Sequence, residues 1–85
     1  MTNREHLLNL KRIREEKFKA SIKASEELTA QYKLYDGFTD LVMPIKEKYF
    51  TNEKDSYQAY LDSQQDFKKF QRDFGNRLND EYIPN

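Results

Sequence analysis

Side chains that could do chemistry are few in this chain of 85 residues. His6 is the only histidine and there is no cysteine, so histidine-based triads, zinc sites and cysteine nucleophiles lack the residues they need. Asp62 and Asp66 lie one helical turn apart, but a carboxylate acts as a general acid only where an apolar enclosure tunes it. Their spacing places them on a solvated helix face. We therefore expect no enzymatic activity, no metal and no cofactor.

A basic stretch, LKRIREEKFKASIK at residues 10–23, is the next candidate site. Phosphate-binding stripes are clear of acids, whereas Glu15 and Glu16 interrupt this one, and the chain as a whole is neutral, with 15 basic and 15 acidic residues. The sequence therefore argues against nucleic-acid binding. The two parts of the chain still differ, because residues 1–35 carry eight basic and five acidic residues and residues 36–85 carry seven and ten. This difference favours an antiparallel pairing of the two parts.

The first element that must position these residues is a long helix over residues 5–35, which contain neither proline nor glycine. Apolar or small residues recur there at close to 3.6-residue spacing. They are Leu7, Leu10, Ile13, Phe18, Ser21, Ser25, Leu28, Tyr32 and Tyr35. On the other side of the helix, Arg12 and Glu16 have the i,i+4 spacing of an ion pair. Gly37 can then supply the backbone conformation that closes a helix.

A second helix is predicted over residues 44–81, after a connector at residues 36–43. Thr39 could cap its start, but we place the start at Pro44, since proline suits a first helical turn. The apolar spacing runs unbroken from Ile45 to Leu78 through the polar stretch TNEKDS at residues 51–56. The sequence thus predicts a single all-α domain over residues 1–85, folded as an antiparallel two-helix hairpin. A three-helix bundle with a break near residues 51–54 remains the alternative.

In such a hairpin, the numbers of facing residues should add to about 80, since the turn lies near residue 40. Leu10 would then lie near Phe70. At mid-length, small residues of the first helix, such as Ala20, Ala24 and Ser25, would face small residues of the second, such as Ser56 and Ser63.

Large apolar residues also occur outside the two stripes that the hairpin can bury. Exposed together, they would form an interface, although scattered exposure or a covering third helix would also account for them. We predict that the partner-binding residues are Ile22, Leu34, Phe38, Phe50, Tyr57 and Leu61. The partner would be another helical protein or a second copy of the chain. Because no apolar run exceeds four residues, we expect no signal peptide, no membrane insertion and a cytoplasmic location.

This layout resembles the Trp-x-Gly family of small proteins handled by type VII secretion systems, which are helical hairpins with an aromatic-x-Gly turn near the midpoint. The turn motif here would be YDG, with Tyr35 where the family has Trp, followed by Asp36 and Gly37. The family's export signal, a Tyr followed four residues later by an acid, lies beyond the second helix. Here that spacing occurs only elsewhere, at Tyr32 and at Tyr49.

The chain is more similar to the small helical partners made alongside larger effectors of such systems, which bind the effectors' helical N-terminal regions. That resemblance implies a targeting or chaperone role by helix packing, compatible with export alongside a partner and without a cleaved signal peptide. The first alternative is a small phage or mobile-element protein that inhibits a host or defence protein by binding it. The second is a helical protein associated with nucleic acid.

Overall fold

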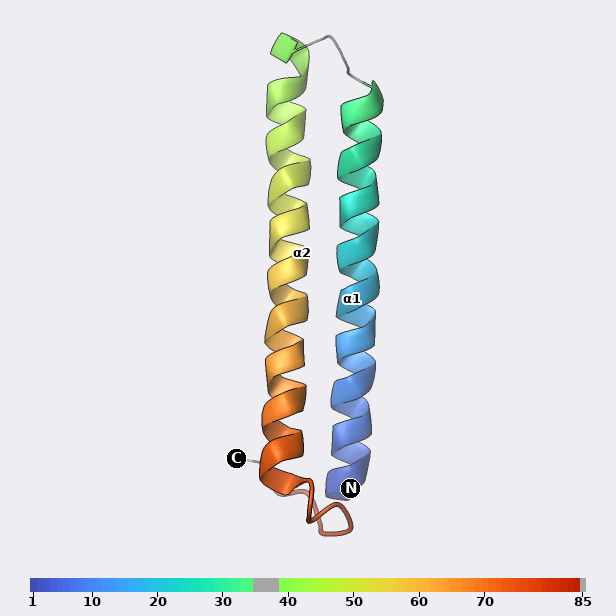
Figure 1. Ribbon diagram of the computed structural model, residues 1–85, viewed down its shortest axis with the longest axis vertical. Coiled ribbons are helices and arrows are strands. Elements are labelled where there is room, and N and C mark those ends of the chain that lie inside the picture. The colour runs from blue at the N-terminus through green and yellow to red at the C-terminus, as the bar shows by residue number, and fades with distance from the viewer. Residues whose placement is uncertain (35–38, 85) are drawn as a thin grey trace.

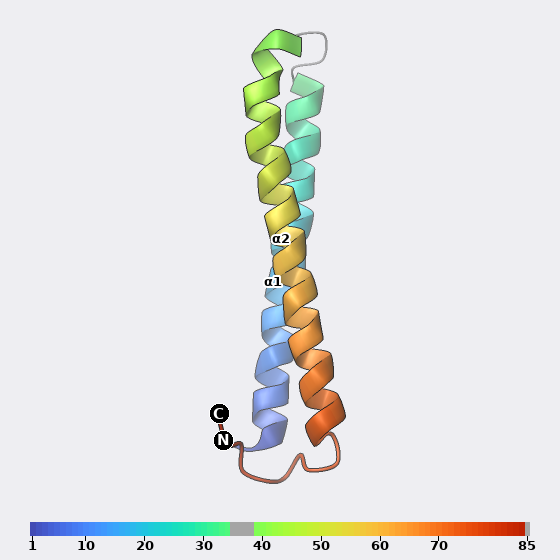
Figure 2. The same cartoon turned by 90° about the vertical axis from the view of Figure 1, so that its left-hand side faces the viewer.

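The computed structural model is a hairpin of two long antiparallel helices, and it describes residues 1–34 and 39–84, with the side chains of residues 1–34 and 47–84 (Figure 1). Helix α1 spans Asn3–Leu34 and helix α2 spans Thr39–Phe74. They lie side by side as a rod of 58 × 18 × 17 Å (Figure 2). The predicted all-α hairpin is confirmed. Because α2 continues through residues 51–54, the three-helix alternative is not needed.

Helix α1 begins at Asn3 because the residues around it form a capping box. The Glu5 backbone N–H donates to Thr2 Oγ1 at 3.3 Å, and the Thr2 backbone N–H donates to Glu5 Oε1 at 3.4 Å. This reciprocal pair satisfies two N–H groups, one of them in the unpaired first turn of the helix. The start predicted at residue 5 was therefore two residues late. Further along α1, Arg12 and Glu16 form the expected ion pair, at 2.7 Å.

Both predicted ends of the second helix differ from the structure. The start predicted at Pro44 is wrong, because α2 begins at Thr39, and proline disfavours but does not forbid helical geometry in the residue before it. The end predicted at Glu81 is also wrong, because α2 stops at Phe74 and Gly75 follows in a turn. The predicted connector at residues 36–43 falls partly outside the described residues.

Residues 75–84, here called the return segment, fold back onto the start of α1 (Figure 2). The first N–H groups of a helix have no partner within the helix, and carbonyl groups of the return segment accept bonds from them. Asn3 N–H donates to Asp80 O at 2.8 Å, Arg4 N–H to Leu78 O at 2.9 Å, and the Asn3 side-chain amide to Arg77 O at 2.9 Å. Tyr82 N–H donates to Met1 O at 2.8 Å. The return segment therefore closes the open end of the hairpin.

The core between the helices is thin. Among the described side chains, the buried hydrophobic residues are Ala24, 3% exposed, and Leu28, 8% exposed. Buried Ser63 donates its hydroxyl to the Tyr60 carbonyl at 2.7 Å, so its polar group is satisfied. Of the small residues predicted to meet at mid-length, Ala24 and Ser63 are buried, whereas Ala20 is exposed.

Contacts across the hairpin agree with the predicted register. The Arg14 guanidinium lies 4.4 Å from the centre of the Phe67 ring, and the rings of Phe18 and Tyr60 are 5.2 Å apart. Leu10 and Phe70 line one pocket near the open end. Each pair adds to about 80, as expected for two helices of equal rise that reverse near residue 40.

Replacing Gly75 with Ala should destabilise the fold, since a Cβ at this position would lie 2.5 Å from the Gln71 carbonyl oxygen. A backbone oxygen cannot give way without moving the last turn of α2. We expect a loss of about 1–3 kcal/mol in the free energy of unfolding, measured by urea denaturation followed by circular dichroism. Asn76→Ala, at the exposed neighbouring position, is the control. Equal midpoints for the two variants would contradict the prediction.

Candidate interaction surface

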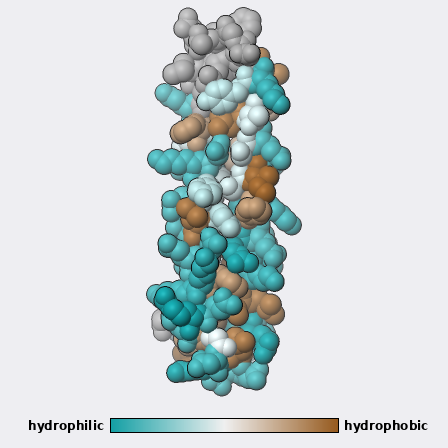
Figure 3. Space-filling view, in the orientation of Figure 1, coloured by the Kyte–Doolittle hydropathy of each residue, from teal (hydrophilic) through white to brown (hydrophobic). Residues whose placement is uncertain are grey.

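Ring contacts and helical spacing place six apolar or aromatic residues of both helices on one side of the rod, and these are here called the apolar face. They are Phe18, Ile22, Phe50, Tyr57, Tyr60 and Leu61. Four of them are about half exposed: Phe18 by 48%, Ile22 by 44%, Phe50 by 59% and Tyr57 by 53%. Figure 3 shows hydrophobic atoms of both helices on the side facing the viewer, in separate patches along the rod. Exposed apolar residues gathered in this way usually mark an interaction site.

Ring contacts join the two helices within the apolar face. The ring centroids of Phe18 of α1 and Tyr60 of α2 are 5.2 Å apart, and those of Tyr60 and Tyr57 are 6.3 Å apart. Ile22 follows Phe18 by one helical turn. Phe50 precedes Tyr57 by two turns, so each pair lies on the same side of its helix. The apolar face is therefore one surface built by both helices.

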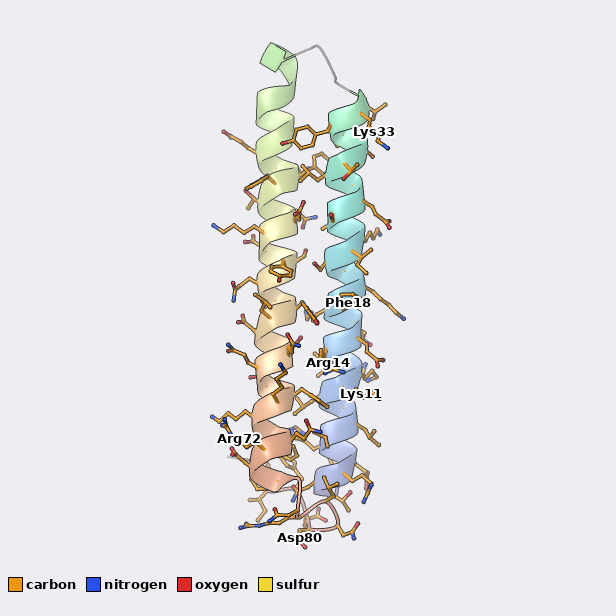
Figure 4. All side chains as sticks on the ribbon, viewed as in Figure 1. Lys11, Arg14, Phe18, Lys33, Arg72 and Asp80 are labelled. Atoms are coloured by element: carbon orange, nitrogen blue, oxygen red, sulfur yellow. The ribbon has the colours of Figure 1, made fainter. Side chains whose placement is uncertain are left out.

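This surface lies near the middle of the rod. Phe18, labelled in Figure 4, is close to the midpoint of α1, which spans Asn3–Leu34. Tyr57 is close to the midpoint of α2, which spans Thr39–Phe74.

The residues predicted to bind a partner fall into three groups. Ile22, Phe50 and Tyr57 are exposed, and Leu61 is half-buried beside them. Leu34 is 69% exposed but ends α1, away from the apolar face. Phe38 lies outside the described residues, as do Tyr35 and Gly37 of the predicted turn motif.

The apolar spacing in the sequence predicts that Phe18 lies in the core, but the structure leaves it exposed. Ten residues separate it from buried Leu28, and at 3.6 residues per turn this spacing rotates the two side chains roughly 80° apart. Phe18 therefore lies at the edge of the seam, with its ring against Tyr60 of α2 and about half of its surface in solvent. Its i,i+4 spacing to Ile22 is the signal in the sequence that could have placed the two residues together.

A second aromatic cluster holds the open end of the hairpin together. The His6 ring stacks on Tyr82, with centroids 3.8 Å apart, and meets Phe70 edge-on at 4.7 Å. Phe70 also stacks on Phe74 at 4.7 Å. His6 is thus packed within an ordered first turn, and its contacts tie the return segment to both helices.

Charged groups at this end are close to the surface. The Met1 ammonium lies 2.9 Å from Glu81, and the hydrogen bond and negative charge of that carboxylate raise the pKa of the ammonium. Over the described residues, no group of three or more His, Cys, Asp or Glu side chains is arranged to hold a metal ion. Within the same part of the chain, neither helix is long and apolar enough to span a membrane.

Comparison with known proteins adds no relative. The chain matches no protein family, no curated protein and no solved structure.

Proposed function

We propose that this chain is a non-catalytic protein–protein interaction module that packs its apolar face against helices of another chain. The observation that carries the proposal is the joint exposure of Phe18, Ile22, Phe50 and Tyr57 on one side of the hairpin. Burying a large apolar side chain contributes roughly 1.5–3 kcal/mol, so a few such residues can offset much of the cost of association. Tyrosine, present here as Tyr57, is one of the residue types that most often anchor interfaces.

The more specific proposal is that the chain serves as a small helical partner or targeting chaperone of a larger protein, such as an effector of type VII secretion. A long helical rod with one apolar side suits this role, because that side can pack lengthwise against helices of the larger protein. Support for the secretion system comes from the hairpin layout alone, since the turn motif lies outside the described residues.

Changing Phe50, Tyr57 and Leu61 to Ser together should abolish partner binding while leaving the chain helical. Wild type and variant, each carrying the same affinity tag, would be purified from the native host and their retained proteins compared by mass spectrometry. We expect wild type to retain a helical partner, whether a larger protein or an untagged copy of this chain, and the variant to retain about tenfold less of it. Retention of the same proteins by both chains would contradict the proposal.

A matched control uses the same helix and the same number of Ser substitutions. Lys48, Asp55 and Asp62 are exposed and follow one another at seven-residue spacing, as Phe50 and Tyr57 do. Their positions are offset by two residues from those of Phe50 and Tyr57. This offset rotates them by roughly 200° about the helix axis, to the other side of α2. The control triple variant should bind as wild type does. Because Leu61 is half-buried, the double variant Phe50→Ser, Tyr57→Ser repeats the test at exposed positions alone.

A further inference from the structure

We infer that the helices on which the apolar face packs are those of a second copy of this chain, placed antiparallel to the first in a four-helix bundle. This inference rests on the proposed function, since it identifies the occupant of the same surface. In a symmetric pair, one surface meets itself about a twofold axis. The axis would cross the rod at mid-length, between Phe18 and Tyr57 of each copy.

The position of the apolar face along the rod supports this arrangement. A surface at mid-length can meet itself across an antiparallel pair with both rods overlapping from end to end. A surface near one end would leave half of each rod unpaired. Phe18, Ile22, Tyr57 and Tyr60 all lie within about two helical turns of the centre of the rod.

Charge complementarity gives the direction. The half of the rod that holds both chain ends consists of residues 1–19 and 61–85, which carry ten basic and eight acidic residues. The other half, residues 20–60, carries five basic and seven acidic residues. An antiparallel pair therefore places the positive half of each copy beside the negative half of the other, whereas a parallel pair would bring like charges together. Such complementarity selects orientation more than it adds affinity.

One whole side of the rod is as large as an interface of standard size. One side of a rod 58 Å long and 18 Å wide has a footprint of roughly 1,000 Å². Stable interfaces of standard size bury about 800 Å² on each partner. A second hairpin would also enlarge a core in which, among the described side chains, Ala24 and Leu28 are the buried hydrophobic residues. Four-helix bundles gain their stability from a shared core of this kind.

The chain has no cysteine, so a single introduced cysteine gives one spin label per chain at a known position. The distance between the labels of two copies then tests the arrangement directly. Lys33 is exposed and lies near the connected end of the rod (Figure 4). At 1.5 Å per residue it is about 20 Å from the centre, so labels on Lys33→Cys should be about 40 Å apart in an antiparallel dimer. In a parallel dimer they would lie within about 20 Å. Lys19→Cys, near the centre, should give a short distance in both arrangements and serves as the control.

Mass measurement by light scattering should show a dimer at about 100 µM wild-type chain. Phe50→Ser with Tyr57→Ser should weaken dimerisation by about tenfold or more, while Lys48→Ser with Asp55→Ser should leave it unchanged. A monomer at this concentration, or a short distance at Lys33, would overturn the inference. A monomer that still binds another helical protein through Phe50 and Tyr57 would leave the proposed function standing. A wild-type chain that neither dimerises nor binds another helical protein would refute both the inference and the proposed function.

Discussion

Removal of residues 77–85 should lower the free energy of unfolding by about 3–5 kcal/mol. The return segment supplies two carbonyl groups that accept hydrogen bonds from the backbone N–H groups of Asn3 and Arg4. A third carbonyl accepts a hydrogen bond from the side-chain amide of Asn3. Each such bond contributes about 1 kcal/mol, and the stack of Tyr82 on His6 adds a similar amount. For a small domain this loss is a large part of a total stability of about 5–15 kcal/mol. Urea denaturation followed by circular dichroism measures it.

Two single substitutions separate the contributions of the return segment. Tyr82→Ala removes the ring but leaves the backbone bonds, so it should cost about 1–2 kcal/mol. Ile83→Ala, at a position 79% exposed, should have no measurable effect. Amide hydrogen exchange at Asn3 and Arg4 should accelerate in the truncated chain and much less in Tyr82→Ala. A truncated chain as stable as wild type would show that the helix start needs no carbonyl groups from residues 77–80.

The hairpin could be predicted from the sequence because its cause is local and repeated. Apolar and small residues keep a helical spacing through both halves, and a single glycine lies between them. The return segment could not be predicted in this way. Leu78 continues the spacing of Phe70 and Phe74, so periodicity alone extends the helix to Glu81. What ends the helix is bonding to residues 1–4, more than 70 positions away, which periodicity does not represent.

The apolar face was predicted in part. Ile22, Phe50 and Tyr57 lie outside the two buried stripes, and the structure places them in solvent, as expected. The spacing predicts Phe18 in the core because a 3.6-residue repeat, traced over many turns, also matches residues rotated by a quarter turn or more from the buried side of the helix. The outcome at Phe18 depends on how each helix is rotated about its own axis. Ala24 and Ser63, which are buried, mark the sides of α1 and α2 that face the seam between the helices.

Leu28→Ala should be the most damaging single truncation on α1, with an expected loss of about 2–5 kcal/mol. Leu28 is 8% exposed and belongs to a core that is thin in the described part of the chain, so the cavity left behind has few neighbours that can close it. Thermal unfolding followed by circular dichroism should show a large drop in Tm. A domain of this size loses roughly 4–8 °C for each kcal/mol.

Leu34→Ala is the matched control, since the same atoms are removed from the same helix at a position 69% exposed. It should change the free energy of unfolding by no more than about 0.5 kcal/mol. Because Leu28 lies in the seam and not on the apolar face, its truncation should lower stability without preventing folded chains from associating. Phe50→Ser with Tyr57→Ser should do the opposite, weakening association with little loss of helix. Equal losses of stability for Leu28→Ala and Leu34→Ala would mean that the seam between the helices is not where this hairpin gains its stability.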